Sequence, residues 1–166
     1  MQLNFSSPKE KEKIRKSIYN LLSSNTLLTL ATIDKKNSHA STAYYVYDKE
    51  LNLYIWTGTN TQHIRNIKKN NRIAITIFDS TQEWGSLLQG LQASGKVIKV
   101  KDKELIKAGM LYIKRYPKVV KFAKKPKGFH KKVYESRIYK IQLEKIKLFD
   151  EKIFGKEEFK EIIIKR

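Results

Sequence analysis

The spacing of apolar residues near the start of the chain predicts an amphipathic helix. Ile14, Ile18, Leu21 and Leu22 recur at intervals of three and four residues. That interval places their side chains on one face of a helix, and polar residues fill the opposite face. We therefore assign a helix to residues 8–24, with its apolar face turned toward the rest of the protein.

Three runs of β-branched and aromatic residues follow this helix, and short polar segments separate them. The runs cover residues 26–33, 39–47 and 51–56. Val, Ile, Thr, Tyr and Trp favour extended backbone, whereas the Asp, Lys and Asn residues between the runs favour turns. Because short turns join antiparallel neighbours, this pattern predicts a three-stranded meander.

Three further strands are predicted at residues 73–78, 87–101 and 136–149. The first of them, IAITIF, is almost continuously apolar, which predicts a strand buried on both faces. Gly90 and Gly95 interrupt the second run. Glycine inside a strand indicates a bulge or the close approach of another backbone or a ligand.

Two more helices are expected between these strands, at residues 61–69 and 103–116. Asp102 is the expected N-cap of the longer helix. Its apolar face consists of Leu105, Ile106, Met110 and Ile113. In the last strand the apolar pattern changes phase near Glu144, which predicts a β-bulge there.

The order of elements predicts a mainly β protein with flanking helices. Six strands joined mostly by short turns favour an antiparallel barrel, because closure removes the exposed sheet edges. The 166 residues fit a single domain. Within it we expect the helix 8–24, five barrel strands in 26–101, a helical, basic insertion in 102–135, and the last strand and tail in 136–166.

Composition excludes several classes of site. The chain has no cysteine, so neither a disulfide framework nor a thiolate metal site is expected. His39, His63 and His130 are widely separated and show no metal-binding spacing. No signal peptide and no apolar stretch long enough to cross a membrane is visible, so we expect a cytoplasmic protein without a membrane partner.

The net charge of +19 favours an anionic partner, such as nucleic acid or a phosphorylated molecule. Most of the cations are lysines interspersed with glutamates. Arginine, the better reader of bases and phosphates, is scarce, which argues against a dedicated nucleic-acid-binding protein and leaves that function as an alternative. The run Lys114–Lys132 holds nine Lys or Arg and no acid. It is either a basic lid over an anionic ligand or a solvated surface segment.

The strongest candidate for a binding site is the strand-to-helix break within Leu53–Asn71. Its polar residues are Thr57, Thr59, Asn60 and Thr61. Asn60 or Thr61 is the expected N-cap, and His63 and Arg65 add side-chain donors in the first helical turn. Free backbone N–H groups, hydroxyls and cationic donors at a helix N-terminus suit phosphate or another anion. The alternative is an ordinary capped turn with a solvated charged face.

These segments, in this order, resemble the FMN-binding split barrels related to pyridoxamine 5′-phosphate oxidase. The residues that carry the resemblance are Leu30-Ala31-Thr32, Ser41–Val46, Tyr54–Thr57, Thr61–Ile67 and Gln89–Gly95. The C-terminal part is similar to an uncharacterised subgroup of that class. The resemblance implies a six-stranded antiparallel split β-barrel, a homodimer with FMN in the groove between subunits, and oxidoreductase activity on a small molecule.

The resemblance also implies two groups of cofactor-binding residues. The phosphate of FMN would meet Thr57, Thr61, Gln62 and His63. The flavin ring would face Ser41, Thr42 and Ala43, and Gln92 would serve the same site or that of the partner subunit. Candidates for a flat wall against the ring are Tyr44, Tyr45, Trp56 and Trp84, which are equally suited to the core or to a dimer interface.

Two departures from the family pattern qualify this assignment. The family usually has lysine where His63 stands, and a neutral histidine would bind phosphate more weakly or in a pH-dependent way. The Arg-x-His substrate motif of true pyridoxamine phosphate oxidases is absent near the C-terminus. Related barrels bind a deazaflavin or heme, so a non-catalytic flavin or heme carrier is the alternative function. The sequence identifies no catalytic acid or base.

Overall fold

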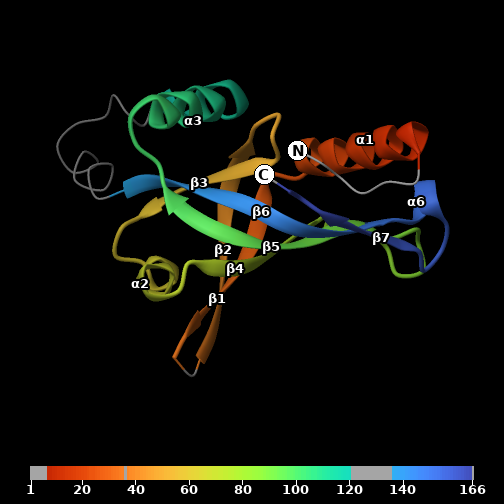
Figure 1. Ribbon diagram of the computed structural model, residues 1–166, viewed down its shortest axis with the longest axis horizontal. Coiled ribbons are helices and arrows are strands. Elements are labelled where there is room, and N and C mark those ends of the chain that lie inside the picture. The colour runs from red at the N-terminus through yellow and green to blue at the C-terminus, as the bar shows by residue number, and fades with distance from the viewer. Residues whose placement is uncertain (1–6, 36, 121–135, 166) are drawn as a thin grey trace.

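In the computed structural model the chain forms a six-stranded antiparallel barrel with a seventh strand added at its side (Figure 1). The structure describes residues 7–35, 37–120 and 136–165. Within them the strands are β1 (Leu27–Asp34), β2 (Asn37–Tyr47), β3 (Asn52–Gly58), β4 (Arg72–Phe78), β5 (Gln89–Lys99), β6 (Ser136–Asp150) and β7 (Phe159–Ile163). Their order is β3-β2-β1-β4-β5-β6-β7, and β3 also pairs with β6, which closes the barrel. The predicted fold class is confirmed.

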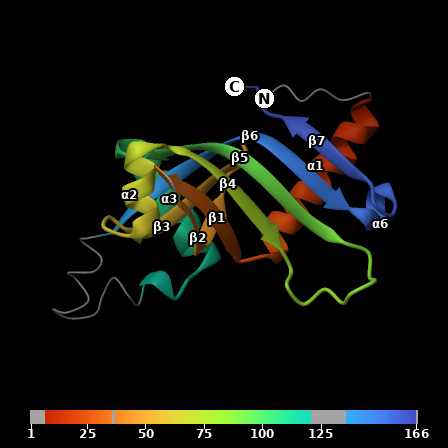
Figure 2. The same cartoon turned by 90° about the horizontal axis from the view of Figure 1, so that it is seen from below.

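Four helices flank the barrel in the described part of the chain. They are α1 (Pro8–Ser24), α2 (Gln62–Lys69), α3 (Asp102–Arg115) and the single turn α6 (Glu151–Phe154). Helices α2 and α1 lie toward opposite ends of the barrel in two perpendicular views, and α3 lies against the outside of its wall (Figures 1 and 2). The described helices include none that is both long and apolar enough to cross a membrane.

The predicted N-terminal helix is confirmed as α1. Ser7 is its N-cap, because the side chain accepts a hydrogen bond from the backbone N–H of Glu10 at 3.2 Å. The four predicted apolar residues are all buried. Together with Ile64 and Ile67 of α2 they join the inward side chains of the strands in one continuous core. The two helices thus close the barrel interior from its two ends.

The prediction that β4 is buried on both faces is wrong. Ile73, Ile75 and Ile77 point into the core, whereas Ala74 and Phe78 are exposed. The strand is paired on both edges, with β1 and β5, so it forms part of the barrel wall and has one inner and one outer face. Its apolar outer residues therefore belong to a surface of the protomer, not to its core.

Two predictions about α3 are also wrong. The residue at the N-cap position is Lys101, and Asp102 is the first helical residue, with no side-chain cap hydrogen bond. The predicted apolar face, from Leu105 to Ile113, is exposed. The helix instead buries Ala108 and Tyr112. The hydroxyl of Tyr112 accepts a hydrogen bond from the backbone N–H of Trp56 at 2.8 Å, so one aromatic residue supplies both packing and a polar anchor.

A cluster around Asp48 fixes α3 to the β2–β3 turn. The carboxylate accepts hydrogen bonds from the backbone and side chain of Asn52, from the hydroxyl of Tyr54 at 2.9 Å and from Nζ of Lys107 at 2.7 Å. Burial alone would raise the pKa of Asp48, but these donors outweigh it and lower the pKa to about 2. Asp48 is therefore charged at neutral pH although it is only 6% exposed.

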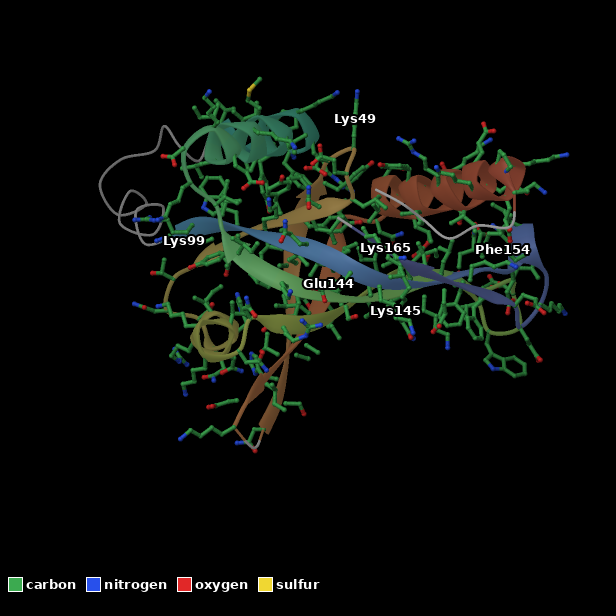
Figure 3. All side chains as sticks on the ribbon, in the orientation of Figure 1. Lys49, Lys99, Glu144, Lys145, Phe154 and Lys165 are labelled. Atoms are coloured by element: carbon green, nitrogen blue, oxygen red, sulfur yellow. The ribbon has the colours of Figure 1, made fainter. Side chains whose placement is uncertain are left out.

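The predicted bulge near Glu144 is confirmed. Ser94 pairs with Lys145 and Gly95 pairs with Leu143, so Glu144 is the extra residue of β6 (labelled in Figure 3). Gly95 lies so close to β6 that an added Cβ would come within 2.9 Å of the carbonyl carbon of Gln142. Gly90 shows no register shift, but its backbone approaches Phe78, where an added Cβ would lie 3.1 Å from the Cβ of that residue.

The C-terminal tail holds a strand that the sequence did not predict. Strand β7 is five residues long and pairs with residues 145–149 of β6, outside the closed barrel. The prediction made for the basic run 114–132 falls largely on residues 121–135, which lie outside the described residues.

Candidate functional site

The β3–α2 junction forms the predicted break between strand and helix. Strand β3 ends at Gly58, and α2 begins at Gln62 with Thr61 at its N-cap position. The hydroxyl of Thr61 does not cap the helix. It donates instead to the carbonyl oxygen of Gly58 at 3.1 Å. The first N–H groups of α2 thus have no side-chain cap, which leaves the positive end of the helix available to an anion.

His63 connects three of the predicted site residues. Its Nε2 atom lies 2.8 Å from Oγ1 of Thr57 and 3.0 Å from Oγ1 of Thr61. The side chain is 9% exposed. One ring nitrogen therefore holds the two hydroxyls on either side of the junction in fixed positions. We refer to Thr57, Thr61 and His63 as the junction cluster.

The imidazole of His63 is neutral at physiological pH. Burial lowers the pKa of His63, and the neighbouring His39 lowers it further. A neutral ring can exchange hydrogen bonds with hydroxyls but adds no positive charge. In the junction cluster His63 therefore positions the hydroxyls, while charge for an anion must come from the end of α2 and from other side chains.

The other polar residues of α2 bond within the protein. Gln62 donates from Nε2 to Oδ1 of Asn66 at 2.8 Å, and Asn66 donates to the hydroxyl of Thr32 at 3.1 Å. Arg65 donates to the carbonyl oxygen of Asn60 and to Oε1 of Gln62, so this predicted donor stabilises the junction loop. Asn66 is 1% exposed and was not predicted as part of the site. Its position four residues after Gln62, on the same helical face, is the signal that could have found it.

The predicted ring-facing residues divide between two faces of β2. Ser41 and Ala43 pair with Leu30 and Leu28 of β1, which point into the barrel, whereas Thr42 pairs with Thr29 and is exposed on the outer face. Ser41 lies on the side of the junction cluster, with its hydroxyl 3.0 Å from Nε2 of His39. Ala43 packs against the core. The side chain of Ser41 therefore lies on the side of the sheet that faces α2, and the side chain of Thr42 lies on the opposite side.

Gln92 shares the outer face with Thr42. Strand register places a row of polar residues directly across five neighbouring strands beyond Thr42: Thr29, Thr76, Gln92, Lys147 and Glu161. Five of these residues, all except Thr42, line an open groove with a volume of about 470 Å³. Small residues, including Ala31, Ala74 and Ser94, line the rest of it. This row was not foreseen, because it depends on pairing between strands that are distant in sequence.

The four candidate aromatic residues have different environments. Tyr45 is fully buried, and its hydroxyl donates to carbonyl oxygens of Leu22 and Asn25. Trp56 packs edge-on against Tyr112 with ring centroids 5.9 Å apart. Tyr44 and Trp84 are exposed, at 62% and 102%. Tyr45 is thus a core residue, Trp56 is partly buried against the cluster beneath α3, and Tyr44 and Trp84 are the most accessible of the four rings.

Two comparisons at the sequence level find relatives. The family model described as pyridoxamine 5′-phosphate oxidase matches residues 14–147 of this chain. The UPF0306 protein PM1958 of Pasteurella multocida is 32% identical over 104 residues, which cover 62% of this chain and 69% of that protein.

Solved structures with the same fold include proteins named for heme. A heme binding protein from Mycobacterium smegmatis matches 96% of this chain and 60% of its own, with a TM-score of 0.70 and 14% identity. The heme storage protein HutZ from Vibrio cholerae matches 78% of this chain and 89% of its own, with a TM-score of 0.64 and 16% identity. At these identities the likeness concerns the fold.

Proposed function

The chain belongs to the pyridoxamine 5′-phosphate oxidase family, and on this premise we propose that it is a homodimeric flavoprotein that binds FMN. We further propose that it acts as an oxidoreductase on a small molecule. When bound, FMN accepts or donates a hydride through its ring, and the protein contributes binding, orientation and electrostatics.

The observation that carries this proposal is the junction cluster at the start of α2. A phosphate monoester requires several hydrogen-bond donors and a favourable field. The cluster offers the hydroxyl of Thr57, and that of Thr61 once it releases the carbonyl oxygen of Gly58, beside a helix N-terminus without a side-chain cap. The donor set therefore fits the phosphate of FMN, with one weakness: the neutral His63 replaces a cation.

The outer-face groove is the proposed contact surface between subunits. It is open, spans β1, β4, β5, β6 and β7, and is lined by small and hydroxyl side chains on one side and by charged side chains of β6 and β7 on the other. Ala74 lies among them with an exposed side chain. A second copy would cover these residues and enclose Thr42 and Gln92, which the isolated protomer leaves exposed. Such enclosure would exclude water from a bound flavin ring.

Heme is the second candidate ligand, because two structures with this fold are named for heme binding or heme storage. Histidine is a common axial ligand of heme iron. In the described residues, however, Nε2 of His39 lies within hydrogen-bond distance of Ser41, and Nε2 of His63 is shared by two hydroxyls. Iron would have to displace one of these bonds to coordinate Nε2 of either ring, which favours FMN over heme at these two nitrogens.

The experiment that tests this function is reconstitution of the purified full-length protein with FMN, a deazaflavin or heme in parallel. We expect saturable binding of FMN with a flavin absorption spectrum, and a dimer by analytical ultracentrifugation. The variant Ala74→Arg should shift the dimer to monomer and weaken FMN binding at least tenfold, or about 1.4 kcal/mol. Lys103→Gln, on the exposed side of α3, is the control. Absence of FMN binding, or a Soret band with heme alone, would overturn the proposal.

A further inference from the structure

A basic hollow lies at the same end of the barrel as α2, on the side of β5 and β6. Its volume is about 390 Å³. Lys68 from α2, Lys99 from β5 and Arg137 from β6 line it, together with Thr59 and Tyr139. Lys99 is labelled in Figure 3, at the end of β5 near the start of β6. Ile67 and Val97 supply apolar walls.

Two lysines of this hollow differ from the paired lysines of the protein. Lys107 pairs with Asp48 at 2.7 Å, and Lys145 pairs with Glu161 at 2.8 Å. Neither Lys68 nor Lys99 forms an ion pair with any described residue, and the described lining includes no acid. Like charges that converge from separate elements repel one another unless an anion neutralises them.

The hydroxyl of Tyr139 also faces this hollow. The residue is 6% exposed, and its hydroxyl bonds to none of the described residues. The hydroxyl oxygen itself remains accessible from the hollow. Burial raises the pKa of Tyr139, although the nearby Arg137 lowers it, so the phenol keeps its proton and can donate.

We propose that the basic hollow binds the phosphate group of a small phosphorylated molecule, at a site separate from the junction cluster. Lys68, Lys99 and Arg137 would neutralise the dianion, Tyr139 would donate a hydrogen bond, and Val97 would contact an apolar part of the ligand. The hollow adjoins the junction cluster, because Arg137 is the register partner of Thr57 on the same face of the sheet. Thr57, Thr61 and His63 are nevertheless not among the residues that line the hollow. The inference does not depend on FMN binding.

Pyrophosphate is a suitable probe for this site. We would titrate it into the 15N-labelled full-length protein at constant ionic strength, with chloride as the balancing ion, and follow backbone amide shifts. We expect saturable shifts centred on residues 59, 68 and 99. The variants Lys68→Gln and Lys99→Gln should each weaken binding at least threefold, and the double variant at least tenfold. Tyr139→Phe should weaken it by a smaller factor while keeping the ring in the core.

The control variant is Lys103→Gln, which removes one charge from an exposed position of α3 and should leave pyrophosphate binding unchanged. Shifts that do not saturate would indicate non-specific attraction of pyrophosphate to the positive protein. The same conclusion would follow if Lys103→Gln weakened binding as much as Lys68→Gln or Lys99→Gln. Either result would overturn the proposal. Loss of pyrophosphate binding on saturation with FMN would place the phosphate of FMN in the hollow and would also contradict a separate site. Binding that persists in His63→Gln supports it.

Discussion

Two buried polar clusters of this protein differ in whether the chain itself supplies a charged partner. Around Asp48, a charged carboxylate accepts hydrogen bonds from Asn52, Tyr54 and Lys107, and the cluster holds α3 to the β2–β3 turn. In the junction cluster, the neutral His63 shares its Nε2 atom with two threonine hydroxyls beside an uncapped helix end. Within the described residues the charge of the first cluster is balanced by Lys107, whereas the second leaves a helix N-terminus without a side-chain cap.

This difference separates a structural role from a binding role. The carboxylate of Asp48 has five donor groups, because the backbone N–H of Glu50 joins those already described. Such a buried carboxylate loses stability when any one donor is removed, and it has no remaining capacity for a ligand. A helix N-terminus flanked by positioned hydroxyls is stabilised when an anion binds to it. We therefore expect changes at Asp48 to act on folding and changes at Thr57 or Thr61 to act on ligand binding.

The largest expected effect on stability comes from Asp48→Asn. The pKa of Asp48 is about 2 in the folded protein and 3.8 when unperturbed, so its charged form contributes about 2 kcal/mol at neutral pH. The folded pKa is depressed, so this contribution is present above pH 3.8 and is lost as the pH falls toward 2. Urea unfolding at pH 7 should show a loss of about 2 kcal/mol in the variant, with FMN affinity unchanged.

The matched control for that variant is Asp34→Asn, which removes a carboxylate from a surface pair with Lys69. Its effect should stay within about 0.5 kcal/mol. Equal losses in both variants would contradict the structural role assigned to Asp48.

A smaller loss of stability is expected for Tyr54→Phe. The hydroxyl of Tyr54 donates to Asp48 at 2.9 Å, and the ring is fully buried. Removing the hydroxyl deletes one donor to a charged acceptor and should cost about 1.5 kcal/mol in the free energy of unfolding. The pKa of Asp48, followed by NMR, should rise in the variant. An unchanged pKa would show that the hydroxyl does not stabilise the carboxylate.

The smallest effect on stability concerns the titration of His63. Because its folded pKa lies below the unperturbed value of 6.5, the unfolded chain binds more protons in this range, and stability falls as the pH drops below 6.5. In His63→Gln this part of the pH dependence should disappear. Asp48→Asn should retain it. Chemical unfolding at a series of pH values tests both, and an identical slope in wild type and His63→Gln would contradict the assignment.

The sequence predicted where the helices and strands lie better than it predicted which of their faces are buried. The apolar spacing located α1, and the phase change at Glu144 located the bulge, because both features depend on neighbouring residues alone. The burial of β4 was misjudged because an apolar strand of a barrel wall looks the same whether its outer side is covered or exposed. Strand β7 was missed because it is short and depends on pairing with β6.

For the candidate site, the sequence predicted which residues belong to it but not which of them lie on the same face or in contact. Thr57, Thr61 and His63 are close in sequence, so the turn that brings them together could be foreseen. The division of Ser41 and Thr42 between opposite faces follows from strand alternation. The outer row from Thr42 to Glu161 and the hollow around Arg137 arise from register between distant strands, which local pattern does not reveal.

The most direct test of a phosphate site in the junction cluster is the ratio of the dissociation constants for riboflavin and FMN. The two ligands share a ring and differ in the phosphate, so the ratio isolates the contribution of that group. We expect FMN to bind at least 100-fold more tightly in the wild-type protein and in the exposed control Thr26→Val. The double variant Thr57→Val/Thr61→Val should reduce the ratio at least tenfold while riboflavin affinity is retained. A ratio near one in the wild type, or one unchanged in the double variant, would contradict the account.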